Sequence, residues 1–159
     1  SNITLSTVGL IEPLKDFLKQ PFCNLAISLS NPINSERVKI MPIEISNPIN
    51  EVIDIIKKNP LKKPLRISFE YVALKGINLS EKHAKTLADL LKGISCHVNI
   101  INWNVHKDSQ FESPDELEPN SFINCLNKFG VLASVRKSRG QDIGAACGQM
   151  AGKANKKIN

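Results

Sequence analysis

The sequence predicts an α/β fold built on a mostly parallel sheet, for which a partial (β/α) barrel is one possible arrangement. Short apolar runs alternate along the chain with segments of helical periodicity, and glycine or proline separates many of them. The length of 159 residues and the hydrophobic content of 42% suit a single globular core. An open doubly wound sheet fits the same pattern, because periodicity does not determine how a sheet closes.

The first half of the chain predicts two strands, two helices and a long loop. Apolar and β-branched residues over 3–6 and 25–29 indicate strands. Apolar residues recur at helical spacing over 10–18 and 49–56. Residues 30–48 carry three prolines and several asparagines, which predicts a long loop between the second strand and the second helix.

The second half continues the alternation of strand and helix. Residues 66–74 alternate as a strand should, with Ile67, Phe69 and Tyr71 on one face and Ser68, Glu70 and Val72 on the other. Ser80 is a suitable N-cap for a helix that runs to Leu91, before Gly93. A strand over 97–101, a helical stripe over 122–129 ended by Gly130, and a last strand over 131–135 complete the pattern.

In either architecture the carboxyl ends of the parallel strands form the functional edge of the sheet. The segments expected at this edge are 6–7, 28–31, 75–78, 102–104 and the chain from Arg136 onward. The net charge of +6 and the pI near 9.2 favour a polyanionic partner such as RNA.

Cysteine usage and hydropathy exclude several classes of protein. The four cysteines are scattered without a CxxC motif or a cysteine/histidine cluster, so we expect no metal site and no dense disulfide framework. A reducing, cytoplasmic compartment is the simplest interpretation. The apolar runs reach about half a dozen residues, short of the roughly 20 that cross a bilayer, so no membrane partner is expected.

The most distinctive segment surrounds Cys147 with glycine and alanine, just after the basic residues Arg136, Lys137 and Arg139. Small neighbours leave a thiol open to a ligand, while basic side chains bind phosphate and favour the thiolate. A buried cysteine in a glycine/alanine packing contact is the alternative interpretation, since free cysteine is among the most buried residue types.

This segment resembles the signature that closes the radical S-adenosylmethionine (SAM) RNA methyltransferases of the RlmN and Cfr type. It is similar to the family run V-R-x-S-R-G-x-D-I-x-A-A-C-G-Q-L, and its basic part, R-K-S-R-G, is closer to RlmN. Other stretches agree with the family in order and spacing: residues 3–9, 25–29, 41–43, 69–78 and 96–104. The chain departs from the family pattern at Ser30-Asn31, where His-Ala is usual, and at Asn102 and Val105, where prolines are usual.

The resemblance implies that the chain is the carboxyl-terminal half of a radical SAM barrel enzyme that methylates carbon 2 of an adenine in 23S rRNA or tRNA. It implies that Cys147 carries the methyl group. By the same resemblance, the residues that contact SAM are Ser6, Ser28, Leu29, Ser30 and Asn104. We expect Arg136, Lys137 and Arg139 to bind RNA.

The resemblance also implies a [4Fe-4S] cluster, but its CxxxCxxC ligand loop is absent from this sequence. We therefore expect the chain alone to be inactive. Residues 1–135 would form the second half of the barrel, and residues 136–159 a basic segment that carries the cysteine motif. The expected partners are RNA and the missing half, or a second copy of the chain that pairs along the exposed first strand.

Two other functions stay open: an RNA-binding partial barrel without chemistry, and a relict fragment without activity. Several isolated side chains favour structural roles. His83 is expected on a helix surface, and Trp103 in packing at a strand end rather than stacked on a base. Glu70 is expected in an ion pair with a lysine such as Lys75, and a functional carboxylate that faces the barrel lumen is the alternative.

Overall fold

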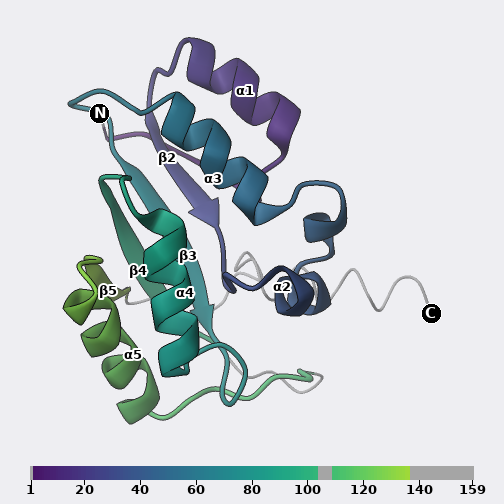
Figure 1. Ribbon diagram of the computed structural model, residues 1–159, viewed down its shortest axis with the longest axis vertical. Coiled ribbons are helices and arrows are strands. Elements are labelled where there is room, and N and C mark those ends of the chain that lie inside the picture. Colours follow the sequence, from purple (N-terminus) through teal and green to yellow (C-terminus); the bar gives the residue numbers. More distant parts are fainter. Residues whose placement is uncertain (1, 104–108, 137–159) are drawn as a thin grey trace.

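A computed structural model of the chain describes residues 2–103 and 109–136 (Figure 1). Its strands form one sheet in which every neighbouring pair is parallel and the spatial order follows the chain. These strands are β1 (Thr4–Thr7), β2 (Asn24–Ser28), β3 (Ile67–Ala73), β4 (Cys96–Asn102) and β5 (Ala133–Arg136). The connecting helices are α1 (Ile11–Lys19), α2 (Asn34–Ile40), the 3-10 helix η1 (Pro42–Ile45), α3 (Ile49–Lys58), α4 (Glu81–Leu91) and α5 (Leu117–Lys128).

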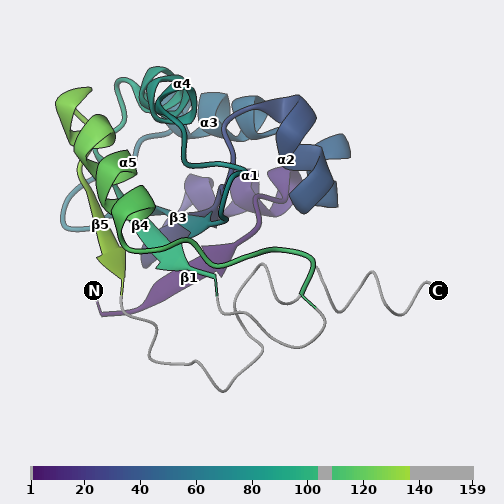
Figure 2. The same cartoon turned by 90° about the horizontal axis from the view of Figure 1, so that it is seen from below.

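The helices all lie on one face of the sheet, and within the described ranges the opposite face carries no helix (Figure 2). A doubly wound sheet has helices on both faces and reverses its strand order at a switch point. The uninterrupted order β1-β2-β3-β4-β5 with helices on one side is instead the arrangement of a (β/α) barrel. The expected partial barrel is confirmed.

The hydrophobic core fills the space between the sheet and the helices. Ile67, Phe69 and Tyr71 of β3 belong to this core, as the alternation along the strand predicts. The residues between them, including Glu70, therefore point to the helix-free face. A smaller apolar cluster forms at the carboxyl end of the sheet around Val72, Leu74 and Trp103.

The predicted long loop over 30–48 is wrong, because α2 and η1 lie within it. Both helices are held by a buried ion pair, with Arg37 Nη1 3.6 Å from Glu44 Oε2. Glu44 also accepts a hydrogen bond from the backbone N–H of Ile49, the first residue of α3. Prolines and asparagines dominate the local composition, whereas the contacts that stabilise α2 and η1 come from the charged side chains of Arg37 and Glu44.

Two helix ends, in contrast to this loop, lie where the sequence predicts them. Ser80 is the N-cap of α4, and its side chain accepts a hydrogen bond from the backbone N–H of His83 at 3.3 Å. Gly130 ends α5 with a φ of 89°. The sheet has two edges, and Thr4, Leu5 and Ser6 of β1 are exposed at one of them. In the described part of the chain, no helix is long and apolar enough to span a bilayer.

Candidate functional site

The carboxyl end of β2 continues into a buried turn, Ser28–Asn31, which contains three of the residues expected to contact SAM. Ser28 and Ser30 are 5% and 4% exposed. The Leu29 side chain belongs to the helix-side core, and its backbone N–H donates to the Glu70 carbonyl oxygen at 2.9 Å. The Leu29 carbonyl oxygen accepts from the Asn31 N–H at 2.7 Å, so both backbone groups of Leu29 already have partners. Ser28, in contrast, points to the helix-free face.

Ser30 has a left-handed backbone conformation, with a φ of 56°. Such a conformation costs on the order of 1 kcal/mol for a residue other than glycine and persists where surrounding contacts enforce it. Here Ser30 Oγ accepts from the Val72 N–H at 3.2 Å, and the Ser30 carbonyl oxygen accepts from Asn78 Nδ2 at 2.7 Å. The first hydrogen bond connects the turn to β3, and the second connects it to the segment that follows β3.

Asn78 lies fully buried between the ends of β2 and β3. Besides its bond to Ser30, its Nδ2 donates to the Val72 carbonyl oxygen at 2.7 Å, and its Oδ1 accepts from the Leu74 N–H at 2.9 Å. The sequence places Asn78 at the functional edge as a turn residue. Its hydrogen bonds show that it joins the two strand ends.

Arg37 supports the same turn from α2, with a side chain that is fully buried. Its Nε donates to the Leu29 carbonyl oxygen and its Nη2 to the Ser28 carbonyl oxygen, both at 2.9 Å. Burial lowers the pKa of Arg37, and the neighbouring Glu44 acts in the opposite direction. The sequence does not single out Arg37, because the prolines and asparagines around it predict a loop. The available signal was the pair Arg37 and Glu44, whose opposite charges lie seven positions apart.

A row of polar side chains crosses the helix-free face of the sheet. The Cα register places Ser28 beside Glu70, Glu70 beside Asn99, and Asn99 beside Ser134. Glu70 Oε1 accepts from Asn99 Nδ2 at 3.1 Å and lies 3.5 Å from Arg136 Nη1. Ser28, expected to contact SAM, and Arg136, expected to bind RNA, are thus both neighbours of Glu70. Ser6 lies on β1, beside Ala26 of β2 in the Cα register, and is exposed on the same face.

The expected ion pair between Glu70 and Lys75 is wrong. Lys75 Nζ lies 3.6 Å from Glu112 Oε2 instead, and Glu70 pairs with Arg136 on β5. The reason is geometric, because Glu70 points to the helix-free face of β3 whereas Lys75 lies in the segment beyond the strand.

His83 is buried, not on the helix surface as predicted. Its Nδ1 is 2.6 Å from Ser80 Oγ, and its Nε2 is 2.7 Å from Glu36 Oε1. The hydrogen bond from His83 is the largest factor that lowers the pKa of Glu36. The expected structural role of His83 agrees with these contacts, since it ties α4 to α2.

Trp103 packs at the end of β4, as predicted, and is 3% exposed. Its ring contacts Phe111 edge to face at 5.7 Å, and its Nε1 donates to Ser109 Oγ at 2.7 Å. A cavity of about 20 Å³ beside it, lined by Ser30, Val72 and Trp103 among others, holds little more than one water molecule. This cavity is too small for a nucleoside.

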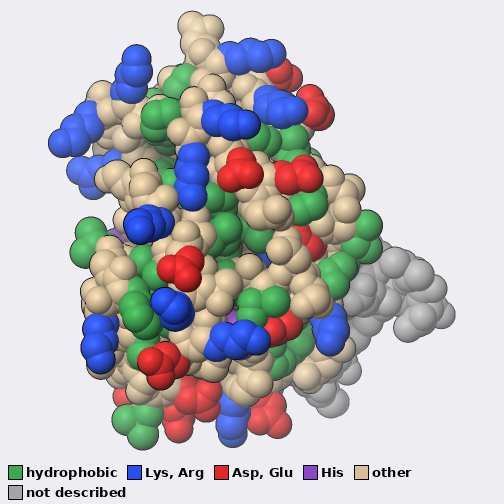
Figure 3. All heavy atoms as spheres, viewed as in Figure 1, with side chains coloured by type: hydrophobic (Ala, Val, Ile, Leu, Met, Phe, Trp, Pro, Cys, Tyr) green, Lys and Arg blue, Asp and Glu red, His purple; other side chains and the backbone are tan. Residues whose placement is uncertain are grey.

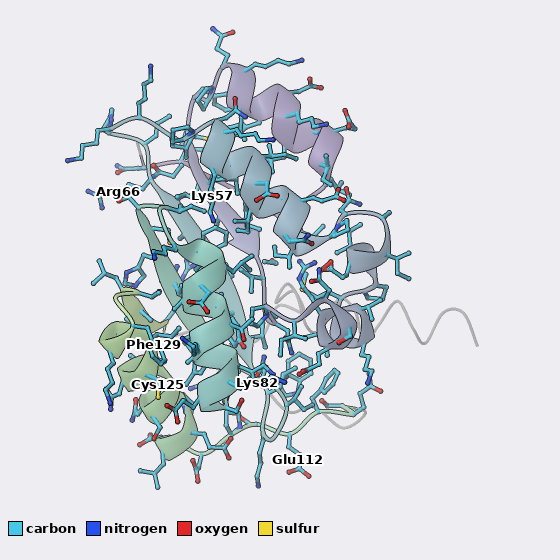
Figure 4. The ribbon with its side chains drawn as sticks, in the orientation of Figure 1. Lys57, Arg66, Lys82, Glu112, Cys125 and Phe129 are labelled. Atoms are coloured by element: carbon cyan, nitrogen blue, oxygen red, sulfur yellow. The ribbon has the colours of Figure 1, made fainter. Side chains whose placement is uncertain are left out.

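A far larger hollow, about 910 Å³, lies at the opposite end of the sheet. Its lining includes Asn24 and Cys96, the first residues of β2 and β4, together with Lys57 and Arg66. Figure 4 shows Lys57 and Arg66 at this end and Lys82 and Glu112 at the other. We place the candidate site at the carboxyl ends in spite of the larger hollow, because the carboxyl ends carry the buried polar groups.

Basic side chains on the helix-covered face do not gather at the predicted site. Lysine and arginine predominate near the amino ends of the strands and mix with acidic side chains elsewhere on this face (Figure 3). The net charge alone therefore does not locate an RNA-binding surface.

The described residues include no group of three or more histidine, cysteine, aspartate or glutamate side chains that could hold a metal ion. Cys23 is buried, and Cys96 and Cys125 are half-buried. Burial raises the pKa of Cys96 to about 11, so its thiol is a poor nucleophile at neutral pH. Four predicted site residues lie outside the described residues: Asn104, Lys137, Arg139 and Cys147.

Comparison with known proteins relates the chain to one group of enzymes, although no protein-family model matches it. A Parabacteroides distasonis protein described as a probable dual-specificity RNA methyltransferase RlmN is 43% identical over 148 residues, which are 93% of this chain and 43% of the relative. The dual-specificity RNA methyltransferase RlmN of Syntrophus aciditrophicus is 41% identical over 153 residues, 96% of this chain and 44% of the relative. The chain thus spans less than half the length of these curated relatives.

Solved structures give the same relationship. The crystal structure of a radical SAM methyltransferase from Sphaerobacter thermophilus matches 92% of this chain with a TM-score of 0.84 and 39% identity, over 43% of its own length. A domain of the pyruvate-formate lyase-activating enzyme from Bacteroides vulgatus matches 84% of this chain and 80% of its own, with a TM-score of 0.64 and 15% identity. The second match shows a shared fold alone.

Proposed function

We propose that this chain, which is homologous to part of the RlmN methyltransferases, is the SAM-binding and methyl-carrying portion of a radical SAM enzyme that methylates an adenine in RNA. The proposal is carried by the alignment, which is 43% identical over 93% of the chain. The acceptor would be carbon 2 of an adenine in 23S rRNA or tRNA, in the cytoplasm. The chain would act only together with the remaining part of the enzyme.

The described residues suit SAM and do not suit an iron-sulfur cluster. Ser6, Ser28 and the Ser30 turn offer hydroxyl and backbone groups at the carboxyl ends of the strands, beside the half-partnered carboxylate of Glu70. For the cluster, no suitable group of ligands exists among the described side chains, and the sequence contains no CxxxCxxC loop. SAM, when bound, supplies the methyl group, and we derive no step at a cluster from this chain.

Cys147 would accept and carry the methyl group. A thiolate is a strong nucleophile, and the nearby basic residues Arg136, Lys137 and Arg139 favour the thiolate over the thiol. The same three residues would bind RNA phosphates. Arg136 is the last residue of β5, and its guanidinium lies 3.5 Å from Glu70 Oε1 on the helix-free face.

The remaining part of the enzyme would complete the sheet at its edges. β1 is exposed at the edge of the described sheet, where a further parallel strand can pair with its outer backbone groups. Without that strand, we expect the isolated chain to associate through β1 with a second copy.

Mass spectrometry tests the proposed function. The chain is co-produced with the remaining part of an RlmN relative, and a gain of one methyl group is sought on the peptide that contains Cys147. We expect methylation in the wild type and in Cys96→Ala, and none in Cys147→Ala. A bare thiol in every preparation, combined with RNA affinity unchanged by Cys147→Ala, would favour an RNA-binding module without chemistry.

A further inference from the structure

Glu70 has an unusual position at the centre of the polar row on the helix-free face. It is 8% exposed, and its neighbours in the Cα register are Ser28 on β2 and Asn99 on β4. A carboxylate is rarely buried unless it is paired or hydrogen-bonded, so both of its oxygen atoms require partners. Glu70 is not among the residues that the family resemblance assigns to a ligand.

Only one of the two carboxylate oxygens has its partners within the described residues. Oε1 accepts from Asn99 Nδ2 at 3.1 Å and lies 3.5 Å from Arg136 Nη1. Oε2 is buried, and no described residue donates a hydrogen bond to it. A buried acceptor without a donor is destabilising, and such a group in a native protein calls for an explanation. A ligand that donates a hydrogen bond would satisfy Oε2.

We propose that Glu70 is a ligand-binding residue whose Oε2 accepts a hydrogen bond from the adenosyl part of SAM bound on the helix-free face of the sheet. The identity of the ligand rests on the proposed function. The absence of a described donor to Oε2 is independent of that proposal, because it follows from the geometry alone. Arg136 already supplies a cation at Oε1, so an uncharged donor suits Oε2 better than a second cation. The ribose hydroxyls and the adenine amino group are the uncharged donors of SAM.

The substitution Glu70→Gln tests this role because it preserves the shape of the side chain and replaces one hydrogen-bond acceptor with a donor. The amide oxygen must face the donors Asn99 Nδ2 and Arg136 Nη1, so the amide NH₂ takes the place of Oε2. A donor then faces the donor of the ligand. The matched control is Glu112→Gln, the same chemical change at a carboxylate whose side chain is 77% exposed.

The experiment is isothermal titration of SAM into the full chain, as wild type, Glu70→Gln and Glu112→Gln, with a thermal melt of each protein. We expect Glu70→Gln to weaken SAM binding at least about ten-fold and to leave the melting temperature unchanged or raised, because it removes a poorly partnered buried charge. Glu112→Gln is expected to bind within about two-fold of the wild type. If Glu70→Gln does not fold, Glu70→Asp, which withdraws the carboxylate by one methylene, is expected to give the same loss of affinity.

Two further titrations identify the source of the donor. Methylthioadenosine contains the adenosyl part without the amino acid, and we expect Glu70→Gln to weaken its binding by a similar factor. A loss seen with SAM alone would assign the donor to the amino-acid part and overturn the proposal. A loss seen with a short adenine-containing RNA, but not with SAM, would assign it to the substrate and overturn the proposal as well.

The outcomes separate this inference from the proposed function. Equal SAM affinity of the wild type and Glu70→Gln would refute the role of Glu70 and leave the proposed function standing. A wild-type chain that binds neither SAM nor methylthioadenosine would refute the proposed cofactor site, and the role of Glu70 would fall with it.

Discussion

Replacing Arg37 with methionine removes the buried guanidinium that holds the end of β2. The change deletes two hydrogen bonds of 2.9 Å, to the carbonyl oxygens of Ser28 and Leu29. It also leaves the carboxylate of Glu44, whose side chain is 4% exposed, without its counter-ion. Loss of one partner from a buried ion pair costs about 3–5 kcal/mol, and methionine fills most of the vacated volume. We therefore expect the free energy of unfolding to fall by about 3–5 kcal/mol, a large share of the stability of a small domain.

Urea denaturation followed by far-ultraviolet circular dichroism measures this change. The matched control is Lys39→Met on the same helix, at an exposed position, for which we expect a change within about 0.5 kcal/mol. Adding Glu44→Gln to Arg37→Met should recover part of the loss, because the unpaired buried charge is then removed. A change below about 1 kcal/mol for Arg37→Met would refute the conclusion that this ion pair organises the turn.

Three further predictions concern pH, thiol reactivity and association. The hydrogen bond from His83 lowers the pKa of Glu36 below its ordinary value of 4.5, so the stabilisation is present above that value and is lost as the pH falls through the folded-state pKa. In Glu36→Gln, the free energy of unfolding should therefore decrease less steeply as the pH is lowered below 4.5, and the same decrease as in the wild type would contradict this. Because burial raises the pKa of Cys96 to about 11, iodoacetamide should label Cys96 slowly near pH 8 in the folded chain and rapidly in urea, as measured by peptide mass spectrometry; equal rates would count against burial. Ile3→Lys, at a side chain 67% exposed next to the free edge of β1, should reduce self-association in light scattering, and a strictly monomeric wild type would disprove the edge contact.

The strands and most of the helices follow from local patterns. Alternation over 66–74 locates β3 within a residue at either end, and Ser80 and Gly130 mark helix ends where the structure has them. These features depend on residues that are close in the sequence, such as a cap and the turn it caps. The apolar stripes suffice for the long helices because each stripe alone decides which side of the helix is buried.

The candidate site was only partly predictable. The sequence placed Ser28 and Ser30 at the end of a buried strand, where the structure has them. It did not indicate that Glu70 would meet Arg136, because the partners are 66 positions apart and are brought together by the parallel pairing of β4 with β3 and β5. His83 was misplaced for the same kind of reason, since its partner Glu36 lies on α2, a helix that local composition does not predict.

The strands, the helices other than α2 and η1, the apolar face of β3 and the family that the closing motif resembles all follow from the sequence. They do so because side-chain periodicity and turn chemistry act over a few residues. Three features are visible in the tertiary structure alone: every described helix covers one face of the sheet, Asn78 joins the ends of β2 and β3, and a carboxylate with one unpartnered oxygen faces the other side. These outcomes depend on the packing of elements that are distant in the chain, and local patterns do not encode that packing.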